Sequence, residues 1–135
     1  MRRSQTISVS IDRPFDEVYD YLVNPANYQY WAPVEPGTFK PLGNGDWQGE
    51  MPKGLRHFRF TPPNNFGVLD HAIFVPGEQL LYTPMRLVPN GKGCELTFTF
   101  FRREGMDDPQ FASTLEWIRT DFLGLKSLLE ARNRV

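Results

Sequence analysis

The chain has 135 residues, of which 40% are hydrophobic and 14% aromatic, and its formal net charge is −1. This length and composition exclude a disordered chain and are typical of one folded domain, so we expect residues 1–135 to form a single domain. The near-neutral charge argues against a nucleic-acid-binding protein, which usually carries a clear positive excess.

The first elements in the chain are predicted to be a strand and two short helices. Apolar and polar residues alternate over residues 5–12, which predicts a half-buried strand. Asp12 as N-cap and Pro14 in the first turn predict the start of a short helix. Asn24 predicts the cap of a second short helix, which Pro33 ends.

Glycine and proline residues divide the middle of the chain into short strands. Residues Pro62–Asn65 and the pair Asn90–Gly91 favour tight turns, so neighbouring strands should pair antiparallel. Pro84 weakens the strand that contains it, because proline has no N–H to donate. We expect strands over residues 37–43, 46–51, 54–61, 66–75, 80–88 and 94–103.

The C-terminal segment is predicted to be one long amphipathic helix. It begins at Asp107 or Asp108 and ends near Arg132. Its apolar residues recur at intervals of four and three and so form one stripe, namely Phe111, Leu115, Ile118, Phe122, Leu125 and Leu129. A curved sheet with one apolar face needs a cover, and this helix is the element long enough to supply it.

Three stretches carry a resemblance to a known superfamily. They are ISVSIDRPFDEVYDYLVNPANYQYWAP, GVLDHAIFVPGEQLLYTPMRLVPNGKGCELTFTFFR and FASTLEWIRTDFLGLKSLLEAR. Their order resembles the START-like (SRPBCC) superfamily, the polyketide cyclase/dehydrase and lipid-transport group. The resemblance implies an α+β helix-grip fold, in which a curved antiparallel sheet of about seven strands wraps around the long C-terminal helix, with two short helices after the first strand.

The resemblance also implies a cavity between the sheet and the helix that takes an apolar small molecule. Members include ring-closing and dehydrating enzymes, lipid carriers and hormone receptors. Because no catalytic motif runs across the superfamily, no catalytic residue is carried over to this chain.

Asp70 and His71 stand side by side within the apolar run of residues 66–75. If Thr61 and Phe66 close one turn, and Val75 and Leu80 the next, Asp70 faces the long helix and His71 faces away. The inward face then carries His57, Arg59, Val68, Asp70, Ala72, Phe74, Leu81, Thr83, Met85, Leu96, Phe98 and Phe100.

The inward face predicts the residues that contact a ligand. A buried carboxylate must be paired, and His57 or Arg59 is the expected partner of Asp70. Trp117 and Asp121, four residues apart on the helix, either line the cavity or face a flank of the sheet. The predicted ligand-binding residues are His57, Arg59, Asp70, Phe74, Thr83, Met85, Phe98, Phe100, Trp117 and Asp121. Tyr28 and Trp31 are predicted to belong to the core or the cavity wall.

Three functions follow from this arrangement. The first is binding of an apolar or aromatic small molecule, with Asp70 fixing its polar group. The second is a cyclase/dehydrase-type enzyme, in which His57 acts as general acid or base and Asp70 orients it. The third is a protein-interaction domain without a ligand. The Asp70 pair also has a purely structural interpretation, as a buried salt bridge or hydrogen bond.

The opposite face of the sheet is a candidate surface for a homodimer. It is expected to present Phe58, Phe60, Leu69, His71, Ile73, Tyr82, Arg86, Glu95, Thr97, Thr99 and Phe101. This is more aromatic than a solvent face requires, although scattered exposed apolar side chains are also common. A register slip of one residue would reverse every side chain and place His57 and His71 on one face. No third ligand stands at a useful spacing, so no metal is predicted.

The single cysteine, Cys94, excludes an intrachain disulfide. No stretch resembles a signal peptide or approaches the roughly 18 apolar residues of a membrane span. We therefore expect a cytoplasmic protein that neither inserts into a membrane nor carries a cofactor.

Overall fold

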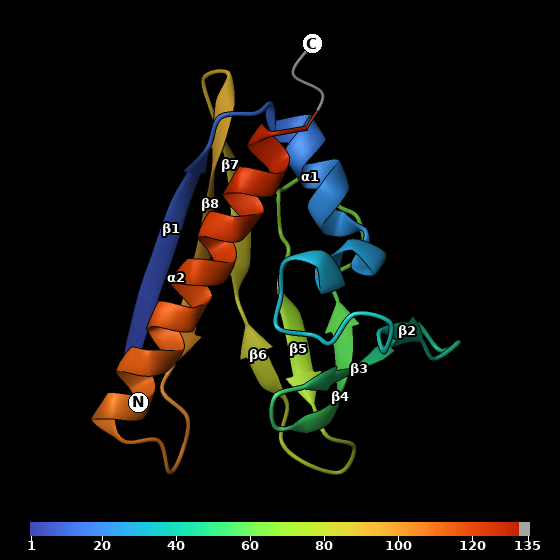
Figure 1. Ribbon diagram of the computed structural model, residues 1–135, viewed down its shortest axis with the longest axis vertical. Coiled ribbons are helices and arrows are strands. Elements are labelled where there is room, and N and C mark those ends of the chain that lie inside the picture. The colour runs from blue at the N-terminus through green and yellow to red at the C-terminus, as the bar shows by residue number, and fades with distance from the viewer. Residues whose placement is uncertain (133–135) are drawn as a thin grey trace.

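A computed structural model describes residues 1–132 as two antiparallel sheets with helices on one side (Figure 1). The elements in chain order are β1 (Ser4–Ile11), α1 (Phe15–Val23), the 3₁₀ helix η1 (Pro25–Tyr30), β2 (Lys40–Pro41), β3 (Trp47–Met51), β4 (Gly54–Phe60), β5 (His71–Phe74), β6 (Leu81–Thr83), β7 (Met85–Asn90), β8 (Gly93–Phe101) and α2 (Asp108–Glu130).

The strands within residues 1–132 form a first sheet of order β1-β8-β7 and a second sheet of order β2-β3-β4-β5-β6. They number eight rather than the predicted seven, because the segment 80–88 divides at Pro84 into β6 and β7. Backbone hydrogen bonds join the two sheets at this division: the Leu69 N–H donates to the Met85 carbonyl over 2.8 Å, and the Thr99 N–H donates to the Pro84 carbonyl over 3.1 Å. The result is the predicted α+β helix-grip architecture.

The long helix α2 is fixed at its start by a capping box. The Asp107 carboxylate accepts from the Gln110 N–H, and the Gln110 side chain accepts in return from the Asp107 N–H. The predicted apolar stripe is buried along its length, except that Ile118 is half-buried. In Figure 1 the helix runs alongside β1. Within the described residues, no helix has both the length and the apolar character required to cross a bilayer.

The short helices follow the sequence signals in part. The Asn24 side chain accepts from the Ala26 N–H over 3.1 Å and so caps η1 as predicted. Asp12 does not cap α1, which begins after Pro14 without a side-chain cap. The Asp12 N–H instead donates to the Glu130 carboxylate over 2.8 Å, which ties the end of β1 to the end of α2.

The core of the described residues is divided into two clusters. The first cluster lies between the first sheet, α1 and α2, and its most buried members include Ile11, Leu96 and Leu125. The second cluster lies on the second sheet around Tyr28 and Phe58. Trp31, by contrast, packs against both clusters.

Candidate functional site

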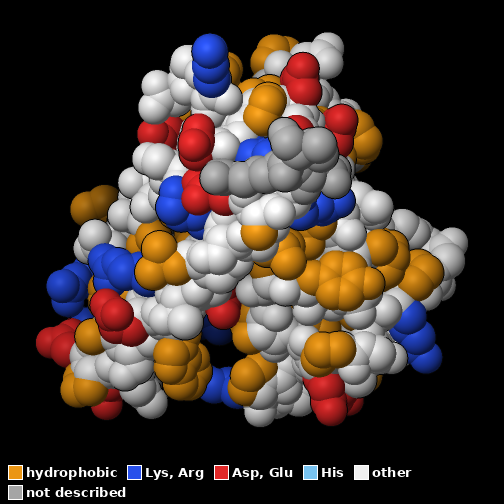
Figure 2. All heavy atoms as spheres, turned by 45° about the horizontal axis from the view of Figure 1, so that its top comes forward, with side chains coloured by type: hydrophobic (Ala, Val, Ile, Leu, Met, Phe, Trp, Pro, Cys, Tyr) orange, Lys and Arg blue, Asp and Glu red, His pale blue; other side chains and the backbone are white. Residues whose placement is uncertain are grey.

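The two core clusters are joined through Trp31, and a groove lies between the two halves of the molecule (Figure 2). Four apolar side chains that pack against the clusters are only half-buried: Phe98 of β8 and Ile118 of α2 at the first cluster, and Phe60 of β4 and Ile73 of β5 at the second. Figure 2 shows a dark recess between the two halves of the molecule, in the lower centre of the view. Side chains that face inward yet keep contact with solvent define a surface that can receive an apolar molecule.

A hydrogen-bonded pair of rings, Tyr28 and His71, lies within the second cluster. The Tyr28 hydroxyl is 3.4 Å from His71 Nε2, and His71 Nδ1 is 3.3 Å from the Leu69 carbonyl oxygen. Because a carbonyl can only accept, Nδ1 carries the proton, and Nε2 accepts from the Tyr28 hydroxyl. Phe60 stacks on the imidazole with ring centroids 5.7 Å apart. The pair is thus held in one orientation.

Burial keeps both rings neutral. It lowers the pKa of His71 to about 4, although the Leu69 carbonyl and the charge of Asp70 act in the opposite direction. Burial likewise raises the pKa of Tyr28 well above its ordinary value. At neutral pH the pair therefore offers hydrogen bonds without charge.

Two charged side chains act on Tyr28 from other elements. Besides burial, the negative charge of Asp121 on α2 raises the pKa of Tyr28, and the positive charge of Arg103 lowers it. Asp121 is half-buried, burial raises its own pKa, and it forms no ion pair with any of residues 1–132. The predicted ligand-binding residue Asp121 therefore acts electrostatically on Tyr28, while Trp117, at 66% exposure, does not line the groove.

The prediction that His57 or Arg59 pairs with Asp70 is wrong. Its carboxylate accepts a bidentate pair of hydrogen bonds from Arg86, over 2.9 Å from Nε and 2.8 Å from Nη2. It also accepts from the Met85 N–H over 2.8 Å and from the Tyr82 hydroxyl. Burial alone would raise the pKa of Asp70, but the hydrogen bonds from Arg86, Tyr82 and Met85 outweigh it and lower the pKa to about 2.

Two register differences cause the error. The β4–β5 pairing lies four residues from the predicted register, which moves His57 away from Asp70, and the β5–β6 pairing lies one residue from it. His71, and not Ala72, lies opposite Thr83. Since neighbouring residues of a strand point to opposite faces, this shift turns His71 inward and Asp70 outward. In the β4–β5 pair, His57 lies opposite Phe74, while the Asp70 carbonyl accepts from the Thr61 N–H. His57 and Asp70 are therefore not brought together.

His57, Arg59 and Phe74 form a separate contact on the outer face. Arg59 makes a bidentate ion pair with Asp46, with both bonds 2.9 Å long, and its guanidinium lies 5.2 Å from the centre of the Phe74 ring. The His57 ring meets the edge of the same Phe74 at a centroid distance of 5.6 Å. These three predicted ligand-binding residues do not face the groove.

The remaining predicted residues point inward as expected. Thr83, Met85 and Phe100 are buried, and Phe98 is half-buried; contact with a ligand stays a prediction for all four. The inward position of His71 and the part played by Arg103 were not predicted from the sequence. A cue for His71 was available in the neighbouring strand, because the pattern FRF favours an inward face containing Phe58 and Phe60.

This register also changes which residues lie on the predicted aromatic outer face. Phe58 is fully buried in the second cluster, and Leu69 is buried in the first. Tyr82 and Phe101 stay exposed, at 60% and 40%. Among residues 1–132, no three His, Cys, Asp or Glu side chains are grouped so that they could hold a metal ion.

Comparison with known proteins finds similarity in structure only. No protein-family model matches the chain, and no curated protein sequence matches it.

Several solved structures share the fold over nearly the whole chain. The solution structure of the Aha1 dimer from Colwellia psychrerythraea superposes with a TM-score of 0.74 at 13% identity, covering 97% of this chain and 98% of that one. Ara h 8.0201 gives a TM-score of 0.70 at 10% identity, with 96% and 98% coverage. DynU16, a protein in the dynemicin biosynthetic locus, gives 0.63 at 18% identity and covers 95% of this chain but 47% of its own. These likenesses are consistent with the START-like fold that the sequence predicts, and at such identities they show the fold alone.

Proposed function

We propose that the protein binds an apolar or aromatic small molecule in the groove between α2 and the second sheet. The observation that carries this proposal is the division of the core. Phe98 and Ile118 at the first cluster, and Phe60 and Ile73 at the second, stay half-buried. A ligand between them would bury this apolar surface, at about 25 cal/mol for each Å² removed from water.

The polar groups beside the groove would orient such a ligand. The Tyr28–His71 pair is neutral, and its two rings are hydrogen-bonded to each other. It can therefore form a hydrogen bond with a ligand without the cost of desolvating a charge. Asp121 has no ion-pair partner among the described residues and can accept from, or when protonated donate to, a ligand hydroxyl. One apolar surface with a few converging polar groups is the usual composition of a small-molecule site.

A second candidate function is catalysis of the cyclase/dehydrase type. The observation that favours it is the carboxyl group of Asp121, whose pKa burial raises and whose charge acts on the Tyr28 hydroxyl. A carboxylic acid with a raised pKa keeps its proton to a higher pH and, while protonated, can act as a general acid. In this version Asp121 and Tyr28 replace the predicted pair of His57 and Asp70, which the fold keeps apart.

Native mass spectrometry of the protein purified from its own host tests the binding function. We expect a non-covalent adduct of an apolar small molecule that is lost on gentle activation. The variant Ile118→Trp fills the groove and should lose the adduct. Leu123→Trp introduces the same side chain at an exposed position of the same helix and should keep it. Absence of any adduct at high protein concentration, or an adduct that Ile118→Trp retains, would contradict the proposal.

A further inference from the structure

Arg103 places a cation beside the apolar lining of the fold. Its guanidinium lies 5.4 Å from the centre of the Phe100 ring, and Phe100 is a buried residue of the inner face. The charge of Arg103 also acts on Tyr28, across the groove on the second cluster. Within residues 1–132, no carboxylate forms an ion pair with Arg103.

A second arginine without an ion pair in residues 1–132, Arg56, acts on Arg103 electrostatically. Arg56 shares the alternation of Phe58 and Phe60, so it belongs to the inner face at the start of β4. Its guanidinium donates to the Leu55 carbonyl over 2.9 Å, and it has no ion pair with the described carboxylates. Burial first, and then the positive charge of Arg56, lower the pKa of Arg103. Burial and the charge of Arg56 thus both disfavour the Arg103 cation, and a bound anion would offset this effect.

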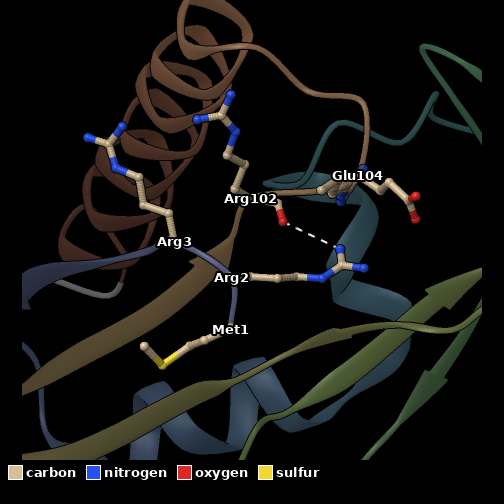
Figure 3. Close-up of a pocket in the computed structure, with 6 residues that line it drawn as sticks. Met1, Arg2, Arg3, Arg102 and Glu104 are labelled. Carbon is tan, nitrogen blue, oxygen red and sulfur yellow. Dashed lines mark hydrogen bonds between the residues drawn. The ribbon is translucent and has the colours of Figure 1, made fainter.

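The other arginines at this end of the fold have partners, so the lack of an ion pair between Arg103 and the described residues is not a general property of a basic surface. Arg3 and Arg102 both reach Asp108, at 3.8 Å for Arg3 and 2.5 Å for Arg102. Arg2, by contrast, donates to the Arg102 carbonyl over 3.4 Å. Figure 3 shows Arg3 and Arg102 directed toward α2, whereas Arg2 extends away from it.

A surface depression of about 310 Å³ lies at this end of the fold. It is lined by Met1, Arg2, Arg3, Arg102, Arg103 and Glu104. Its volume is sufficient for a small head group and adjoining carbon atoms. The depression connects the unpaired Arg103 to solvent, so a charged group can reach it.

We propose that the ligand of the groove is an amphipathic carboxylate, whose carboxylate lies between Arg103 and Arg56 and whose apolar part extends along Phe98 and Ile118. This inference rests on the proposed function and specifies its ligand class. A planar carboxylate matches the guanidinium group, which can donate two parallel hydrogen bonds to it. The Phe100 ring under Arg103 holds the cation in place before the anion arrives.

Isothermal titration calorimetry with decanoate and decanol at about pH 8 tests the proposal. The two compounds have the same chain length and differ in charge. The unaltered protein should bind decanoate at least about tenfold more tightly than decanol. Arg103→Gln and Arg56→Gln should each reduce this preference and leave decanol binding unchanged. Arg119→Gln removes an arginine that is paired with Glu116 on the exposed side of α2, and it should keep the full preference.

The outcomes separate the two proposals. Equal affinity for both compounds, or a decanoate preference that survives in either Arg103→Gln or Arg56→Gln, overturns the carboxylate proposal and leaves groove binding standing. Binding of neither compound to the unaltered protein contradicts both. Decanol binding by Arg103→Gln shows that this variant is folded, so a selective loss of decanoate affinity is attributable to the missing charge.

Discussion

The imidazole of His71 on β5 meets the hydroxyl of Tyr28 on η1 at 3.4 Å. The two rings also pack edge to face, with centroids 5.3 Å apart. This contact joins a helical segment near the start of the chain to the middle of the second sheet. The buried position would solvate a charged imidazole poorly. The stability of the folded protein should therefore depend on pH.

We expect the protein to lose stability as the pH falls from about 6.5 to about 4. The pKa of His71 is about 4 in the folded protein, below its ordinary value of 6.5. Between these values the unfolded chain binds the proton and the folded chain does not, so acid favours unfolding; above pH 6.5 this contribution to stability is fully present. The free energy of unfolding should fall by at most about 1.4 kcal/mol per pH unit.

Urea denaturation between pH 7.5 and pH 4.5 measures this slope. His71→Gln should flatten it, because no imidazole remains to be charged at that position. His57→Gln changes a histidine on the outer face and should keep the slope. Identical slopes in the unaltered protein and His71→Gln would show that His71 does not cause the pH dependence.

The Tyr28 hydroxyl is predicted to stabilise the fold through His71. Tyr28→Phe retains the ring in the second cluster and leaves His71 Nε2 buried without its donor. We expect a loss of about 1–3 kcal/mol, the usual penalty for an unsatisfied buried group. Tyr30→Phe at a 64% exposed position should change stability by less than about 0.5 kcal/mol. Equal stability of the two variants would mean that the Tyr28–His71 hydrogen bond contributes nothing.

Asp70 is predicted to hold β6 and β7 together across the break at Pro84. Asp70→Asn weakens its hydrogen bonds to Arg86, which is 52% exposed, and to Tyr82. We expect a loss of about 2–3 kcal/mol, less than for a fully buried pair because solvent screens Arg86. The pKa of Asp70 is about 2 against an ordinary 3.8, so its contribution is present above pH 3.8 and lost as the pH falls toward 2.

A double-mutant cycle checks this assignment. Asp70→Asn combined with Arg86→Met should cost less than the sum of the two single variants, since they remove one shared interaction. Asp70→Asn combined with Arg59→Met should be additive, because Arg59 is paired with Asp46. Additivity in both cycles would disprove the coupling of Asp70 and Arg86.

Gly67 is predicted to tolerate no side chain. Its φ is +66°, and a Cβ at this position would lie 2.0 Å from the Leu87 carbonyl oxygen. That carbonyl is backbone of β7, so it cannot rotate away, and Gly67→Ala should cost at least about 2 kcal/mol. Gly124 of α2 has open space around its Cβ position, and Gly124→Ala should stabilise by up to about 1 kcal/mol. Thermal unfolding of both variants gives the comparison; a Gly67→Ala variant that melts with the unaltered protein would be incompatible with this close approach.

The elements of this fold are predictable from local patterns, whereas the orientation of two strands is not. The apolar stripe of α2 and the alternation of β1 depend on neighbouring residues, and both predictions are confirmed. The direction in which Asp70 points depends instead on the pairing of β5 with β6, which the loop between them sets. A shift of one residue in that loop reversed the predicted faces of β4 and β5.

The partner of Asp70 illustrates the same limit. The burial of Asp70 and its need for a cationic partner were predictable, because its carboxylate stands within an apolar run. Arg86 was not predictable as that cation, because it comes from the far side of the break at Pro84. Arg103 was equally difficult to identify, since a residue just after a strand has no face assigned by alternation.

The pairing of β1 with β8 sets an order of assembly. Ser4 lies opposite Phe101, and Ile11 opposite Cys94, so the first strand must wait for residues more than eighty positions away. The second cluster, by contrast, is drawn from residues 28–73 and needs fewer distant contacts. We therefore expect the second cluster to form before the first, whose closure requires β8 and α2.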